Sequence, residues 1–116
     1  MKKKKIPKAS ILITNFNKEK YINKALSTSL NQTYKNFEVL AYDDGSTDRS
    51  INIIKKYKKI SLIINKNKIK KSPPQNQILG ILALFKRSKG KYIFFLDGDD
   101  YFKKNKIKFF VKYVKK

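Results

Sequence analysis

The stretch YIFFLDGDDYF, residues 92–102, places three carboxylates within four positions, directly after five apolar or aromatic residues. An apolar run of this length, rich in aromatic residues, predicts a buried strand. Acids that follow such a strand lie where α/β proteins bind ligands, beyond the carboxyl ends of the strands. The stretch therefore indicates an α/β sheet with an acidic site after residue 96.

The acidic residues are few and clustered. The chain has 29 Lys+Arg against 8 Asp+Glu, a formal net charge of +21. Six of the eight acids form two groups: Asp43, Asp44 and Asp48, and Asp97, Asp99 and Asp100. Because acids without a specific role would be scattered over the surface, these groups are the first candidates for function.

The composition limits the chemistry. A chain of 116 residues fits one domain with one modest core. Without cysteine it has no disulfide framework and no thiolate metal site, and without histidine it lacks the commonest general base. Any metal must be held by oxygen ligands, which favours Mg²⁺ or Mn²⁺.

The positive charge allows two interpretations: solvated surfaces, or attraction to an anionic membrane or nucleic acid. Arginine occurs only at Arg49 and Arg87, which disfavours specific nucleic-acid recognition. The apolar stretches at 9–13 and 78–85 are too short for a signal peptide core and a membrane span, respectively. We expect a cytoplasmic protein, with peripheral contact at the inner face of the membrane as an alternative.

Strands and helices are expected to alternate along the chain. The predicted strands are 10–14, 37–42, 60–64 and 92–96, and the predicted helices are 18–32, one with inward-facing Ile51, Ile54 and Tyr57, a buried helix at 78–85, and a final amphipathic helix. Asn17 is expected to cap the first helix, and Ser46 or Thr47 the second. Pro73-Pro74 are expected to keep the loop 65–77 irregular. This order predicts a parallel sheet covered by helices on both faces.

If the first, second and fourth strands are neighbours, their carboxyl ends bring one set of polar residues together. These are Thr14, the pair Asp43-Asp44, and Asp97-Gly98-Asp99. Grouped carboxylates repel one another unless a metal or lysines compensate them. Gly98, without a side chain, would let a diphosphate approach the backbone between two acids.

Three segments together resemble the start of a family 2 glycosyltransferase with a GT-A fold: NQTYKNFEVL (31–40), DDGSTD (43–48) and FLDGDD (95–100). The resemblance extends over nearly the whole chain from about Lys8. It implies a Rossmann-like GT-A fold, truncated, with residues 1–7 as a basic tail and residues 8–116 as a partial nucleotide-sugar-binding domain.

The resemblance also implies residue roles. Thr14 matches a residue that contacts the nucleotide base, and Asp44, beside Asp43, matches the acids that hold base and ribose. Asp97 matches the first acid of the DxD motif, and Asp99 the acid that ligates Mg²⁺ or Mn²⁺ on the donor diphosphate. The implied function is inverting sugar transfer from a UDP-linked donor, in glycan or cell-envelope polysaccharide synthesis.

Structural explanations stand beside these roles. Asp43-Asp44-Gly45 could form only a turn, Asp48 could stabilise a helix N-terminus, Asp100 could cap the last helix, and Thr14 could simply end a strand. A calcium loop of the EF-hand type starting at Asp97 is excluded because Phe102 and Lys108 occupy the required Gly and Glu positions.

The chain departs from the family pattern in two places. The segment 65–77 lacks the usual Asn-x-Gly and the arginine of Ala-Arg-Asn; Asn76 matches the final Asn, and Lys70 or Lys71 are candidate substitutes for the arginine. The family also continues into an acceptor half with the catalytic base, so no catalytic residue is assigned and a glycan or lipid-linked acceptor would bind through that half. The alternative is a truncated, non-catalytic module that binds a nucleotide or an anionic surface.

Overall fold

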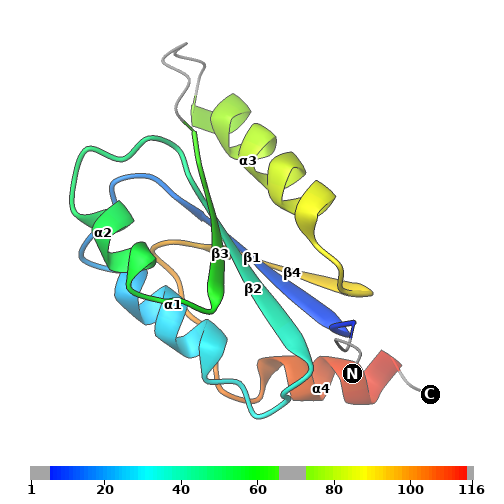
Figure 1. Cartoon of the computed structure of the whole chain (residues 1–116). Helices are drawn as coiled ribbons and strands as arrows, with labels where there is room; N and C mark the ends of the chain where they lie inside the picture. Colours follow the sequence, from blue (N-terminus) through cyan, green and yellow to red (C-terminus); the bar gives the residue numbers. More distant parts are fainter. Residues whose placement is uncertain (1–5, 66–72, 115–116) are drawn as a thin grey trace, which may run out of the picture.

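A computed structural model of the chain describes residues 6–65 and 73–114. It confirms the alternation of strands and helices (Figure 1). The elements are β1 (Ala9–Asn15), α1 (Ile22–Leu30), β2 (Phe37–Asp43), α2 (Ser50–Lys55), β3 (Ile60–Ile64), α3 (Pro73–Arg87), β4 (Tyr92–Asp97) and α4 (Lys106–Val114). Residues 1–5 of the expected basic tail, and Lys70 and Lys71, lie outside the described residues.

The four strands form one parallel sheet in the order β3-β2-β1-β4. The first strand therefore lies between the second and the fourth, as the expected site requires. Thr14 is opposite Tyr42 on one side and Asp97 on the other, and Asn15 is opposite Asp43. The predicted parallel α/β sheet is confirmed.

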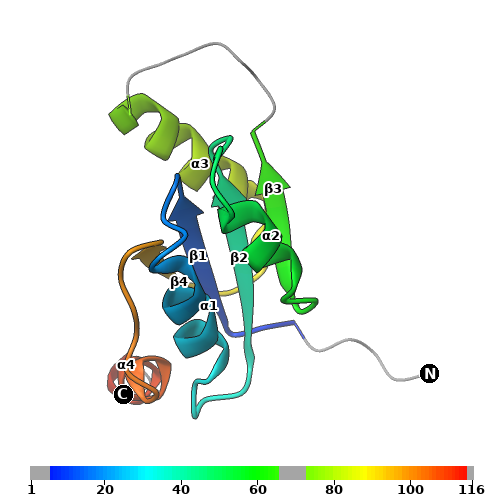
Figure 2. The ribbon, with the colours of Figure 1, turned by 90° about the vertical axis from the view of Figure 1, so that its left-hand side faces the viewer.

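Helices cover both faces of the sheet, as predicted. Alternate residues of β1 point to opposite faces, so Ile11 and Ile13 pack with α1, α2 and α4, whereas Leu12 packs with Leu84 of α3. Figure 2 shows α1 and α2 on one side of the sheet and α3 alone on the other. The larger hydrophobic core thus lies on the α1–α2 side.

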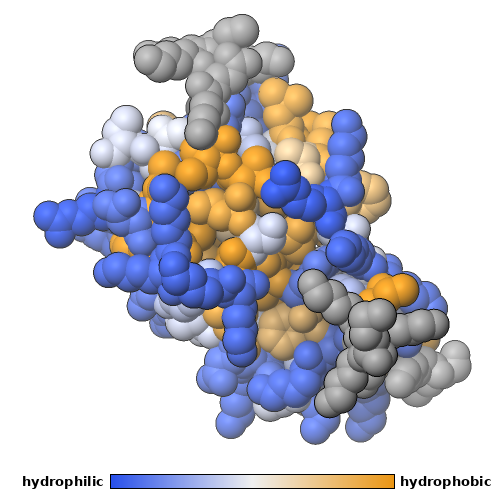
Figure 3. Space-filling view, viewed as in Figure 1, coloured by the Kyte–Doolittle hydropathy of each residue, from blue (hydrophilic) through white to orange (hydrophobic). Residues whose placement is uncertain are grey.

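Helix α3 differs from the prediction in two ways. It begins at Pro73, so Pro73-Pro74 do not exclude regular structure: the first turn of a helix needs no N–H donors and suits the φ of proline. Ile78–Phe85 is also not a buried helix, because Ile78 is 57% and Phe85 55% exposed. One helix on this face buries only one stripe, and Figure 3 shows apolar surface over α3 and beside it on the sheet.

The predicted caps were wrong. The residue at the N-cap of α1 is Tyr21 and that of α2 is Arg49, and neither makes a capping hydrogen bond through its side chain. Asn17 and Ser46 bond instead to residues of other loops, as described below. In the described part of the chain, no helix is both long and apolar enough to span a bilayer.

Substitution of Gly80 tests the packing of α3 on the sheet. A Cβ at this position would lie 2.4 Å from Cδ1 of Tyr42, whose ring is buried. We expect Gly80→Ala to lower the free energy of unfolding by about 1–3 kcal/mol, as in overpacked cores, although alanine favours a helix. Urea denaturation measures this, with Leu82→Ala at a half-exposed position of α3 as the control. A Gly80→Ala variant that is as stable as the unsubstituted chain would contradict the contact.

Candidate functional site

The carboxyl ends of β1, β2 and β4 are joined by backbone hydrogen bonds. The N–H of Gly98 donates to the carbonyl oxygen of Thr14 at 2.8 Å, and the N–H of Asp44 donates to the carbonyl oxygen of Asn15 at 3.0 Å. Thr14 therefore adjoins the DxD segment, and Asn15 adjoins the acids after β2. The structure brings the three predicted groups to one end of the sheet.

Asp43 lies inside the protein rather than on its surface. Its side chain is fully buried and accepts hydrogen bonds from Nδ2 of Asn15 (2.8 Å), the N–H of Gly45 (3.0 Å), and both the N–H and the hydroxyl of Ser46 (2.7 Å each). Gly45 has a φ of +80°, a conformation that favours glycine. These bonds fix the loop after β2 and give Asp43 a positioning role.

Two asparagines tie the loops together: Asn15, which was not predicted from the sequence, and Asn17, which was predicted only as a helix cap. Asn15 is buried and bonds Asp43 and also Oγ of Ser46 (3.3 Å). Asn17 has a left-handed φ of +52°, which asparagine tolerates, and its Oδ1 accepts from the N–H of Thr47 at 2.8 Å. The signal in the sequence was the polar run directly after an apolar strand. Both residues hold the loop after β1 against the loop after β2.

Asp44 faces a different environment from its neighbour Asp43. It is partly exposed, and its Oδ1 accepts a hydrogen bond from Nδ2 of Asn65 at 2.9 Å. Asn65 directly follows β3, so the acid pair is held from both adjacent strands. Asp44 is thus the acid of this pair that lies nearer the solvent.

Thr14, Asp97 and Asp99 form the other part of the site. The hydroxyl of Thr14 lies 3.4 Å from Oδ1 of Asp97, whose side chain is exposed. Asp99 is 44% exposed, and the ammonium of Lys18 lies 3.4 Å from its Oδ2. An ion pair this exposed contributes little to stability, so Lys18 can leave Asp99 at low cost.

Gly98 is required by contacts within the protein. A Cβ there would lie 2.6 Å from Oδ1 of Asn15 and 3.3 Å from the carbonyl oxygen of Thr14. Gly98 therefore allows β4 to end closely against the end of β1. This reason is separate from the expected approach of a diphosphate, which stays a prediction.

The acids do not form a complete metal site by themselves. In the regions 6–65 and 73–114, no three acidic side chains are close enough together to hold a metal ion. Mg²⁺ and Mn²⁺ are, however, often bound by one or two carboxylates together with substrate phosphates and water. The exposed Asp99, close to Asp97 in the chain, fits that kind of site.

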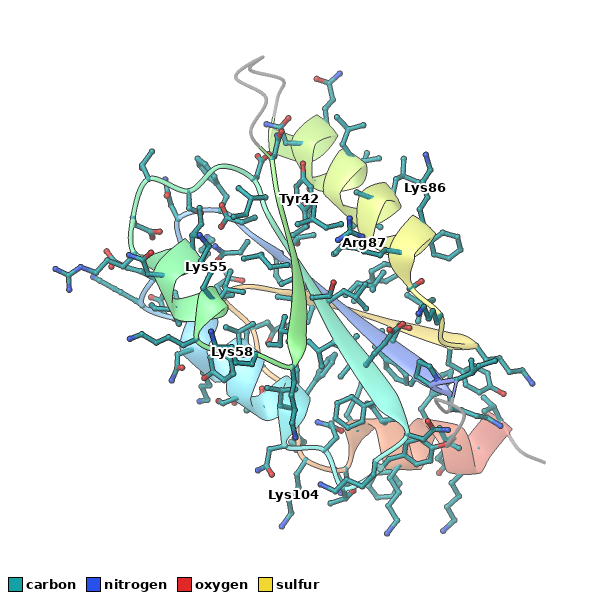
Figure 4. All side chains as sticks on the ribbon, viewed as in Figure 1. Tyr42, Lys55, Lys58, Lys86, Arg87 and Lys104 are labelled. Atoms are coloured by element: carbon teal, nitrogen blue, oxygen red, sulfur yellow. The ribbon has the colours of Figure 1, made fainter. Side chains whose placement is uncertain are left out.

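Two side chains near the site have shifted pKa values. Burial, followed by the negative charges of Asp44 and Asp43, raises the pKa of Tyr42. This phenol, which lies between β2 and α3 (Figure 4), therefore stays neutral at physiological pH. For Asp48, desolvation raises the pKa, but hydrogen bonds from the hydroxyl and N–H of Ser50 and the N–H of Glu19 outweigh it and lower the pKa.

A family model described as Glycosyl transferase family 2 matches residues 10–116. Among curated proteins, the chain is 39% identical over 98 residues to the Escherichia coli enzyme WfaP, named UDP-Glc:alpha-D-GlcNAc-diphosphoundecaprenol beta-1,3-glucosyltransferase. That match covers 84% of this chain and 38% of WfaP. The chain spans 15–40% of the length of the first curated relatives that it matches.

Solved structures share the fold. The structure of residues 1–349 of TarS from Staphylococcus aureus, in complex with UDP-GlcNAc, is 28% identical with a TM-score of 0.76; the match covers 93% of this chain and 31% of that TarS chain. The mannosyltransferase PcManGT from Pyrobaculum calidifontis, in complex with GDP-Man and Mn²⁺, is 16% identical with a TM-score of 0.69. That match covers 83% of this chain and 28% of the PcManGT chain. At this sequence identity the similarity supports the fold alone.

We expect Asp43→Asn to destabilise the protein far more than Asp44→Asn. The amide would turn an NH₂ group toward donors that now bond a buried carboxylate, at a cost of about 3 kcal/mol. Asp44 is partly exposed, so the same change there should cost less than about 1 kcal/mol. Urea unfolding of both variants measures the difference. Equal losses of stability would contradict the positioning role of Asp43.

The lowered pKa of Asp48 predicts that the free energy of unfolding depends on pH. Because its pKa is lowered in the folded protein, its ionised form stabilises the fold above the unfolded pKa of about 3.9, and this stabilisation is lost as the pH falls through the folded pKa. Asp48→Asn should therefore be less stable than the unsubstituted chain at neutral pH. The difference in the free energy of unfolding between Asp48→Asn and the unsubstituted chain should become smaller when urea titrations are repeated toward about pH 3. A difference that stays constant over this range would show that the charge of Asp48 is not the cause.

Proposed function

Because this chain belongs to glycosyl transferase family 2, we propose that the carboxyl ends of β1, β2 and β4 bind a UDP-linked sugar donor. The observation that carries this proposal is the hydrogen-bonded junction of the three strand ends, with Thr14, Asp44 and Asp97 gathered there. Ligands of parallel α/β sheets bind at this end.

Each residue has a proposed role. Asp44, partly exposed, holds the base or ribose, and buried Asp43 holds the loop that presents Asp44. Thr14 is largely buried, and its proposed contact with the base rests on the family resemblance alone. Asp97, exposed and beside the Thr14 hydroxyl, contacts the ribose side of the donor.

Asp99 is the proposed ligand of Mg²⁺ or Mn²⁺. Such a metal would offset the negative charge that develops on the departing nucleoside diphosphate. The support is chemical: Asp99 offers exposed carboxylate oxygens and already attracts one cation, the ammonium of Lys18. With a metal on Asp99, Lys18 would no longer be needed to compensate that carboxylate and would be free to contact the diphosphate.

The complete reaction needs an acceptor site and a catalytic base in addition to the donor site. We propose inverting sugar transfer on the cytoplasmic side of the membrane, to a glycan or lipid-linked acceptor in cell-envelope polysaccharide synthesis. The similarity to WfaP, whose name describes a diphosphoundecaprenol-linked acceptor, supports this substrate class. No acid among the described residues is nominated as the catalytic base.

Calorimetric titration of UDP, with and without Mn²⁺, tests the donor site. We expect metal-dependent binding that Asp99→Asn weakens by at least about 1.4 kcal/mol, a factor of ten. Asp100→Asn is the matched control, because Asp100 is also exposed but bonds the N–H of its neighbour Tyr101.

The control should bind UDP as tightly as the unsubstituted chain. Circular dichroism first establishes that all three proteins are folded. A folded chain that does not bind UDP, or two variants that are equally weakened, would overturn the assignment of Asp99.

A further inference from the structure

Helix α4 exposes aromatic side chains although it already has a buried stripe. Ile107 and Val111, four residues apart, pack into the core. On another face, Phe109, Phe110 and Tyr113 remain exposed, with Tyr113 at 70% and Phe109 at 53%. The fold therefore accounts for one apolar stripe of α4 and leaves a second one in solvent.

These aromatic rings belong to a continuous surface with lysines around it. We call it the α4 surface and define it by the residues Tyr101, Lys103, Lys106, Phe109, Phe110 and Tyr113. Together with Phe102 and Asn105 they line an open hollow of about 620 Å³. Phe110 packs edge-to-face on Tyr92 and Phe94 of β4, and Phe102 packs edge-to-face on Phe94. Tyr101, Phe109 and Tyr113 are each more than half exposed.

The charge on this part of the molecule has one sign. Residues 101–114 contain five lysines, all exposed, and no acidic residue. Figure 4 shows the side chain of Lys104 extending from the lower edge of the molecule, beside α4. A partner of the α4 surface must therefore offer negative charge at its border and apolar material for the rings.

An anionic lipid bilayer has both properties. Helices that lie in the bilayer interface carry lysines on one side and aromatic residues on the other. Tyrosine is favoured at the depth of the headgroups, and lysines are attracted to anionic lipids. The α4 surface has no arginine, the residue best suited to reading nucleic acid.

We propose that the α4 surface docks this protein on an anionic membrane. Tyr101 lies two residues after Asp99, whereas the rest of the surface lies on α4 and in the segment directly before it. The inference does not depend on donor binding. Phe110 contacts Tyr92 at the start of β4, and Lys104 accepts a backbone hydrogen bond from Thr33, before β2. Figure 1 shows α4 at the end of the sheet where the strands begin. Docking would leave their carboxyl ends facing away from the bilayer.

Vesicle flotation with the full chain tests the proposal. We expect binding to mixed phosphatidylglycerol–phosphatidylcholine vesicles and little binding to pure phosphatidylcholine. Lys103→Gln with Lys106→Gln should weaken binding roughly 25-fold, since each lysine near an anionic surface contributes about a factor of five. The matched control is Lys55→Gln with Lys58→Gln, an exposed pair at α2, which should change binding less than about twofold.

The aromatic rings are tested separately. Phe109→Ser with Tyr113→Ser should reduce binding, whereas Leu79→Ser with Leu82→Ser, on the exposed side of α3, should not. The chain has no tryptophan, so Tyr113→Trp provides a single tryptophan, whose emission should shift to the blue on anionic vesicles. Phe85→Trp on α3 is the control and should not shift.

Several results would overturn the proposal. Equal losses from the two lysine pairs would mean that binding follows net charge rather than the α4 surface. If the emission of the Tyr113→Trp variant did not shift on anionic vesicles, the rings would not enter the bilayer. Vesicle binding that is absent in the folded chain, together with RNA binding that requires Phe109 and Tyr113, would assign the surface to nucleic acid instead.

Discussion

The buried carboxylate of Asp43 is the constraint on which the candidate site depends. It has no exposed surface, and its hydrogen bonds come from the amide of Asn15, two backbone N–H groups and the hydroxyl of Ser46. A buried charge is tolerated only when such dipoles replace water. Satisfying Asp43 therefore fixes the end of β1 against the loop after β2, and Asn17 adds a second connection between the same loops.

This frame divides five of the six clustered acids into two groups. Asp43 and Asp48 direct their oxygens at groups of the protein and hold the loops in place. Asp44, Asp97 and Asp99 lie nearer the solvent, at the ends of β2 and β4, the two strands that flank β1. In a chain with a net charge of +21, lysines are available to neutralise these outer acids, as Lys18 does for Asp99. The outer acids can therefore lie at the same end of the sheet without a protein-built metal cage among the described residues.

Much of the fold could be predicted because buried strands and amphipathic helices have distinct apolar patterns. The exposure of α3 could not, because it depends on how many helices cover that face of the sheet. The caps were mispredicted because Asn17 and Ser46 bond across loops, a contact between distant residues that no local pattern encodes. The burial of Asp43 had a signal in the sequence: Val39 and Ala41 lie on the same side of β2. This alternation was enough to predict that Asp43, rather than Asp44, faces inward. The identity of its partner Asn15 could not be predicted, because it depends on the register between β1 and β2.

Paramagnetic broadening by Mn²⁺ in a ¹⁵N–¹H NMR spectrum tests the central claim, the location of the donor site, most directly. With UDP present, we predict that substoichiometric Mn²⁺ broadens the amide signals of Gly98 and Asp99 first, then those of Thr14 and Asp44, and leaves those of α3 sharp. Without UDP the same signals should broaden much less, because Asp99 has too few protein ligands around it to retain the metal alone. Broadening that is equally strong with and without UDP would contradict a donor site built on this frame. So would broadening that is centred away from the ends of β1, β2 and β4.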